Sequence, residues 1–178
     1  IDIYRKDYQK GIKTLKKALL STKKRDQRAR IHFILGQLNE RIKQGDEAIK
    51  NYNEVISLNP EYEMSFRASL NKSIAYAHAS GSPRELIKDY NKMLKDVKNK
   101  DYRDQIYYAL AEIKLNQGDT VLGINHLKES LQAFMFNVDQ KLQTHLRLSV
   151  IYLQKKEYKG AYVQHDSIIM LIELEDDR

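Results

Sequence analysis

Residues 46–60 decide the fold, and they read DEAIKNYNEVISLNP. A small residue, Ala48, is followed four positions later by Tyr52 and three positions after that by Val55. Residues at these spacings lie on one face of an α-helix. The stretch ends at Pro60, which favours a helix boundary. It therefore predicts a helix that buries one small and two larger side chains along a single face.

The same pattern recurs in segments 7–19, 83–94, 118–131 and 157–168. Its first position falls at Gly11, Ala48, Leu86, Gly123 and Ala161. The spacing between successive copies is almost constant, since it alternates between 37 and 38 positions. A fixed period of this length is the signature of a repeat architecture, in which each unit buries its apolar face against its neighbours.

A second helix is predicted before each copy from Ala48 onward. In 28–43, 101–117 and 138–155 a Leu and a small residue stand 12 positions before the first position of the next copy: Leu35–Gly36, Leu110–Ala111 and Leu148–Ser149. A small side chain there lets the two helices of a pair approach closely. Segment 62–80 needs a one-residue shift, because Ala75 lies 11 positions before Leu86.

Local signals place the helix ends. Ser82 to Glu85 reads as a capping box with Pro83 at the first helical position, and Gly118–Asp119 and Asn59–Pro60 are typical of helix starts. Gly45–Asp46 and Ser80–Gly81 indicate tight turns between paired helices. We therefore expect about nine helices joined by short connections.

The small–aromatic–small spacing, the Leu-Gly pair, the Gly-Asp turn and Pro60 resemble the tetratricopeptide repeat (TPR). The resemblance implies an all-α fold, a right-handed superhelical solenoid over residues 1–178. A half-repeat would occupy 1–22, and helix pairs would occupy 24–60, 61–98, 99–135 and 136–175. Three residues depart from the pattern: Asn39 replaces an aromatic residue, and His32 and His145 replace bulky apolar ones.

Four stretches are similar to a narrower family, the TPR lipoproteins of Bacteroidetes associated with gliding motility and type IX secretion (PorW/SprE). They are ARIHFILGQLNE (29–40), LNPEYEMSFRASLN (58–71), LKDVKNKDYRDQIYYALAEI (94–113) and YVQHDSIIMLIELEDD (162–177). This resemblance implies a periplasmic protein, anchored at the outer membrane in its full-length form. It also implies a scaffold between secretion-motor components and the outer-membrane translocon. A cytoplasmic location is the alternative.

The amino-acid composition argues against several kinds of site and fold. Without any Cys the chain holds no disulfide, no thiolate metal site and no cysteine nucleophile. The longest apolar run, 168–172, is far shorter than the apolar stretch that a membrane-spanning helix needs. With 7 Gly and 2 Pro in 178 residues, an all-β fold is also disfavoured.

The net charge of +7 is concentrated near the N-terminus. Residues 1–30 contain 11 Lys or Arg against 3 acidic residues, whereas 31–178 contain 20 against 21. A basic helix of this kind predicts either a nucleic-acid or anionic-lipid surface or, as we favour, a merely solvated terminal helix. Its cations are Lys10, Lys13, Lys16, Lys17, Lys23, Lys24, Arg25, Arg28 and Arg30.

No catalytic or metal-binding motif is evident, and we expect neither enzymatic activity nor a cofactor. No two of the five histidines have the spacing of a helical zinc site. His145 and His165 lie in paired helices and could meet. Because no third ligand is nearby, the pair favours a polar spot in the core over a metal site. Asp101 and Asp104 lie at a predicted helix start, where acidic side chains cap the helix and interact favourably with the positive end of its dipole.

A helical solenoid binds partners on its concave face, which the first helix of each pair lines. We therefore predict a protein or peptide partner held by Phe33, Tyr76 and Tyr108, since Tyr and Arg are frequent interface anchors. The region of Asn71 and Lys72 alone resembles a clamp for a C-terminal carboxylate, so we expect none. The predicted groove residues are Arg30, Phe33, Gln37, Arg41, Asn71 or Lys72, Tyr76, Gln105, Tyr108, Glu112, Gln143, Leu146 and Val150.

Overall fold

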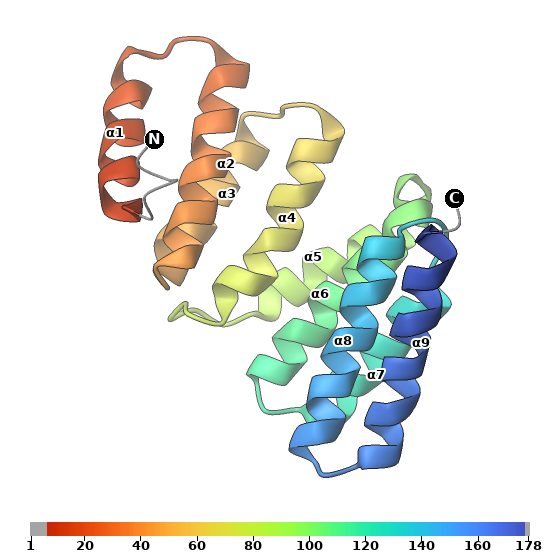
Figure 1. Ribbon diagram of the computed structural model, residues 1–178. Coiled ribbons are helices and arrows are strands. Elements are labelled where there is room, and N and C mark those ends of the chain that lie inside the picture. The colour runs from red at the N-terminus through yellow and green to blue at the C-terminus, as the bar shows by residue number, and fades with distance from the viewer. Residues whose placement is uncertain (1–6, 177–178) are drawn as a thin grey trace. The chain divides into compact units, whose positions relative to one another are not determined.

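The structure is a computed structural model that describes residues 7–176, with side chains described from Asp7 to Glu173. Every regular element in this part of the chain is helical, which confirms the predicted all-α fold (Figure 1). The helices are α1 (Tyr8–Ser21), α2 (Arg25–Arg41), α3 (Gly45–Ser57), α4 (Tyr62–Tyr76), α5 (Arg84–Lys95), the short 3-10 helix η1 (Val97–Tyr102), α6 (Arg103–Asn116), α7 (Thr120–Gln132), α8 (Val138–Gln154) and α9 (Tyr158–Asp176). We call α2, α4, α6 and α8 the first helices, and α3, α5, α7 and α9 the second helices.

The chain divides into two compact units, Ile1–Ile87 and Lys88–Arg178. In the first unit α2 packs against α1, α3 and α4, and α3 also packs against α4. In the second unit α6 pairs with α7 and α8 pairs with α9, while α8 also contacts α6 and α7. A continuous single array and its right-handed superhelix remain predictions.

Small residues bring the paired helices together, as the sequence predicts. At Gly36 of α2 a Cβ atom would lie 2.5 Å from the ring of Tyr52 on α3. At Gly123 of α7 it would lie 2.5 Å from the side chain of Leu115 on α6. A real Cβ atom does not come this close, so a larger residue at either glycine would make the Tyr52 ring or the Leu115 side chain shift. Around these contacts the cores of the two units form from Ala48, Tyr52, Val55, Ala68 and Ala75, and from Ala111, Ile124, Leu127, Leu148 and Ile151.

Polar side chains start several helices by capping them. Asp7, Asp119 and Asn137 each accept a hydrogen bond from the backbone N–H three residues later, at 3.1, 3.1 and 3.0 Å. Such caps satisfy one of the four N–H groups that have no partner within the first turn of a helix. The predicted helix start at Gly118–Asp119 is therefore confirmed.

Three hairpins share one turn. Lys43, Gly118 and Lys156 adopt the left-handed conformation, with φ of 61°, 81° and 60°. In each case the following N–H donates to the carbonyl five residues earlier, at 2.8 to 3.0 Å, which is the Schellman motif. The predicted turn at Gly45–Asp46 is wrong, because Gly45 is the first residue of α3. Sequence reasoning placed the glycine in the turn, whereas a lysine occupies it.

Candidate partner-binding face

The predicted groove residues fall on the first helices, in two sets that we describe separately. On α2 of the first unit Arg30, Gln37 and Arg41 are exposed, and Phe33 is half-buried. The Phe33 ring meets Tyr52 edge to face, with ring centres 5.9 Å apart. On the neighbouring α4 the side chains of Asn71, Lys72 and Tyr76 are half-buried.

A polar network ties three helices of the first unit together. The Tyr52 hydroxyl donates to Glu40 Oε2 at 3.0 Å, and Asn71 Nδ2 donates to the Tyr52 oxygen at 3.4 Å. Burial raises the pKa of both Glu40 and Tyr52, and the negative charge of Glu40 raises the pKa of Tyr52 further. Sequence analysis placed Tyr52 in the core but did not predict its polar partners. Asn71 therefore supports the helix packing through its amide.

In the second unit the predicted residues lie on α6 and α8. Gln105, Tyr108 and Glu112 are half-buried on α6, while Leu146 and Val150 are exposed on α8. Gln143 of α8 is exposed as well. Because α6 contacts α8, these two helices form one continuous surface. Its amide, phenol and aliphatic groups are suited to holding a peptide backbone and apolar side chains.

An ion pair that the sequence did not reveal crosses this surface. Arg147 of α8 donates from Nε to Glu112 Oε1 at 2.6 Å and from Nη2 to Oε2 at 3.2 Å. Burial and the charge of Glu112 raise the pKa of Tyr108 to about 12, against the opposing charge of Arg147. Because the charges of Arg147 and Glu112 neutralise each other, the pair adds no net charge to the α6–α8 surface. The two residues lie 35 positions apart, so helix periodicity gives no signal for the pair.

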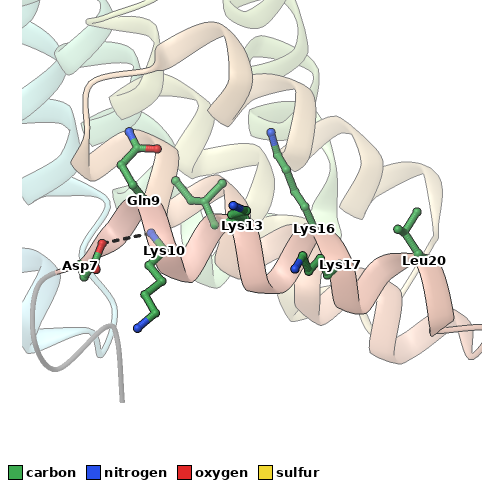
Figure 2. Close-up of a pocket in the computed structure, with 8 residues that line it drawn as sticks. Asp7, Gln9, Lys10, Lys13, Lys16, Lys17 and Leu20 are labelled. Atoms are coloured by element: carbon green, nitrogen blue, oxygen red, sulfur yellow. Dashed lines mark hydrogen bonds between the residues drawn. The ribbon is translucent and has the colours of Figure 1, made fainter.

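The basic N-terminal helix forms a separate surface. An open hollow of about 780 Å³ lies along α1, lined by Lys10, Lys13, Lys16 and Lys17 with Leu20 at one end (Figure 2). Two of the predicted surface cations instead bind backbone carbonyls. Arg28 donates to Leu19 and Thr22 at 3.0 and 3.2 Å, and Arg25 donates to Leu58. These two arginines therefore hold helix ends in place.

A second hollow, of about 370 Å³, lies at the open end of the α6–α7 hairpin. Lys100, Arg103, Tyr107 and Glu129 are among the residues that line it. Neither hollow coincides with the predicted groove residues on the first helices. Which of those residues touch a partner stays a prediction.

The two paired-helix histidines have different partners. His145 Nδ1 lies 2.8 Å from Gln164 Oε1, and His165 Nε2 lies 2.8 Å from Ser149 Oγ. Both contacts join α8 to α9. Among the side chains described, from Asp7 to Glu173, no three of His, Cys, Asp or Glu gather as they would around a metal ion. No helix in this part of the chain is long and apolar enough to cross a membrane.

Residues 29–62, which span most of α2, all of α3 and the first residue of α4, match the family model described as Tetratricopeptide repeat. The chain contains a tetratricopeptide repeat. Its TPR-like fold extends further, because two solved structures resemble 99% of the chain. No curated protein is significantly similar to it in sequence.

The first of these structures is a Rap protein complexed with competence and sporulation factor, at 16% identity and a TM-score of 0.70. The second is the apo form of RapI, at 15% identity and a TM-score of 0.64. The chain spans 52% of the first protein and 68% of the second. At these identities the likeness shows a shared fold.

Proposed function

We propose that the chain is a non-enzymatic protein-interaction module that holds a segment of a partner protein against its first helices. The observation that carries this proposal is the α6–α8 surface, where exposed Leu146 and Val150 lie on α8, beside the helix of Gln105 and Tyr108. TPR-type arrays bind partners on the face that their first helices line. The Rap protein complexed with competence and sporulation factor shows a related fold in a complex.

More specifically, we propose that this module is a periplasmic scaffold within a lipoprotein that serves secretion and gliding motility. Its support is the resemblance of residues 29–40, 58–71, 94–113 and 162–177 to that family. The partners would then be components of the secretion motor or of the outer-membrane translocon.

A pull-down from detergent-solubilised cells tests both the interaction module and its role in secretion. The full-length protein is the bait, and mass spectrometry identifies the proteins recovered. Recovery of motor or translocon components supports the secretion setting. Recovery of a different protein set retains the interaction module and rejects that setting.

Variants of the recovered complex then test the binding surface. Val150→Asp should weaken partner binding at least about tenfold, because it places a charge in an apolar contact. Val121→Asp is the matched control, since Val121 is an exposed valine on α7, which is one of the second helices. Phe33→Ala and Tyr108→Ala extend the test to the aromatic anchors. Equal affinity for all variants, with helicity retained, would reject the surface.

Nucleic-acid binding is the second candidate, and the lysine-lined hollow on α1 favours it. Phosphate contacts release counterions, so the affinity for single-stranded RNA should fall steeply with salt. Reversing Lys13, Lys16 and Lys17 to Glu should abolish this binding. Reversing Lys95, Lys98 and Lys128, which lie elsewhere on the surface, should leave much of it intact. No binding at low salt would dismiss this candidate.

A further inference from the structure

The hollow at the open end of the α6–α7 hairpin is lined by residues that the proposed binding surface does not use. It measures about 370 Å³ and lies within the second unit. This volume is at the lower end of the range for ligand pockets in proteins, so the hollow suits one or two side chains better than a large ligand. Its lining combines cationic, aromatic, acidic and apolar groups, which include Lys100, Arg103, Tyr107, Glu129 and Met135.

Two cations line this hollow without an ion-pair partner among the described residues. Arg103 is the first residue of α6, and its Nε is buried without a hydrogen-bond partner. Lys100 of η1 is exposed, and no acidic side chain that the structure describes lies within ion-pair distance of it. A buried donor without an acceptor costs free energy in the folded chain. An anionic group in the hollow would supply acceptors for these two cations.

The acidic side chain of the lining is held by a histidine. Glu129 Oε2 lies 2.6 Å from His126 Nδ1 on α7. The His126 ring in turn stacks on Tyr107 of α6, with ring centres 6.3 Å apart. Glu129 is therefore fixed in place and does not pair with Arg103. With Lys100 and Arg103 positive and Glu129 negative, the lining carries one net positive charge.

The loop between α7 and α8 adds an apolar rim to the hollow. Met135 lines the hollow, and Phe136, the next residue, is 82% exposed. The loop is held by contacts with α8: the Lys141 ammonium lies 4.5 Å from the centre of the Phe134 ring, and Asn137 accepts from a backbone N–H of α8 at 3.0 Å. A loop that is fixed in this way loses little conformational entropy when a partner binds to it.

We propose that the hollow binds the carboxylate of an aspartate or glutamate in a peptide segment of a partner, with a neighbouring apolar side chain of that segment on Met135 and Phe136. The Arg103 guanidinium and the Lys100 ammonium hold the carboxylate, since charge-assisted hydrogen bonds are stronger than neutral ones. A carboxylate carries one negative charge, which matches the net charge of the lining. A phosphate group carries about 1.5 to 2 and would be repelled by Glu129. This site goes beyond the proposed binding surface on the first helices.

Blocked tripeptides titrated into the isotope-labelled chain test the proposal, with amide chemical shifts in NMR spectra as the readout. The probes are acetylated leucyl-X-leucinamides, in which X is glutamate, glutamine or phosphoserine. The glutamate peptide should shift amides at the start of α6 and the end of α7. It should bind at least about tenfold more tightly than the glutamine peptide, because only its carboxylate receives charge-assisted bonds. It should also bind more tightly than the phosphoserine peptide. The absence of these shifts, equal affinity of the glutamate and glutamine peptides, or tighter binding of phosphoserine would overturn the proposal.

Substitutions in the chain locate the site. Arg103→Gln should weaken binding of the glutamate peptide at least about tenfold. Arg84→Gln is the matched control, because Arg84 is also the first residue of a helix, is exposed and lines neither hollow. Circular dichroism checks that both variants keep their helices, and Lys100→Gln repeats the test at an exposed residue. Affinity that is unchanged in Lys100→Gln, or equal in the Arg103 and Arg84 variants, would reject the site.

Two further comparisons test the charge match and the apolar contact. Glu129→Gln removes a negative charge and keeps a hydrogen-bonding group for His126, so the phosphoserine peptide should gain affinity relative to the glutamate peptide. A glutamate peptide flanked by glycines should bind more weakly than the one flanked by leucines, because its contact with Met135 and Phe136 is lost. Unchanged relative affinities in Glu129→Gln would contradict the charge match. Equal binding of the two glutamate peptides would contradict the apolar contact.

Discussion

Two lysines in turns of this fold lie in the left-handed region of backbone conformation. For an L-residue the left-handed conformation costs about 1 kcal/mol, because Cβ crowds the backbone, whereas glycine adopts it freely. Lys43 and Lys156 carry this cost in turns where the third hairpin has Gly118. The hydrogen bonds of the Schellman motif offset it.

Replacing Lys156 with Gly should therefore raise the free energy of unfolding by about 0.5 kcal/mol, the strain relief less the greater freedom of glycine in the unfolded chain. Lys155→Gly is the control, because Lys155 has a right-handed conformation with φ of −80° and should lose stability instead. Urea unfolding compares the two. A loss of stability in both variants would mean that the lysine side chain at 156 has a role of its own.

Asp104 links stability to pH. This side chain is buried at the start of α6, with Oδ1 accepting from the Gln105 N–H at 2.8 Å and Oδ2 without a hydrogen-bond partner. Burial raises its pKa above the ordinary 3.8. Below pH 3.8 both folded and unfolded forms are protonated. As the pH rises the unfolded chain loses its proton first, so the free energy of unfolding falls until the pH exceeds the raised pKa.

Asp104→Asn removes this titration and should keep the bond from Gln105. We expect the variant to gain stability relative to the parent at pH 7 and to lose that advantage below pH 3.8. Urea unfolding at a series of pH values measures the difference. A constant difference at every pH would show that the carboxyl group does not titrate differently in the two states.

At the scale of helices, the sequence predicts most of the fold. Apolar residues at helical spacing, recurring with a near-constant period, place the helix pairs, and the structure has helices within those segments. The turns are harder to predict because a left-handed lysine looks like any other lysine in a sequence. The Arg147–Glu112 pair and the Tyr52 network also escape prediction, since their partners lie on helices whose relative rotation only packing determines.

The close approach of α3 to the end of α4 depends on Gly45. A Cβ atom there would lie 2.3 Å from the carbonyl carbon of His78 and 2.4 Å from the carbonyl oxygen of Ala75. Gly45→Ala should lower the free energy of unfolding by about 1–3 kcal/mol, because backbone cannot move aside as a flexible side chain can. Gly81→Ala is the control, since a Cβ atom at Gly81 would meet nothing within 4 Å. Equal stability of the two variants would show that α4 shifts at little cost.

At the scale of the whole molecule, two units each have their own core. The boundary between Ile87 and Lys88 falls inside α5, in the one pair whose sequence register needs a shift. Stability in repeat proteins is approximately a sum of local terms. A defect should therefore remain largely within the unit that contains it.

Hydrogen–deuterium exchange of the Gly45→Ala variant measures this. Amides of α2, α3 and α4 should exchange faster than in the parent, while those of α6 to α9 should change little, because local opening follows local stability. Gly123→Ala, which places a Cβ atom 2.5 Å from Leu115, is the reciprocal variant in the second unit. Uniform acceleration across the chain in either variant would indicate that the units unfold together.

The shared left-handed turn relates three hairpins whose turn residues differ in type. Residues 29–62 match a repeat family, and positions 43, 118 and 156 all have left-handed φ angles and the same pattern of backbone bonds. Two of these positions hold lysine and one holds glycine. The turns of these hairpins are thus more alike in their backbone torsion angles than in their residue types. A comparison of the hairpins by backbone dihedral angles would therefore find a similarity that a comparison of residue types overlooks.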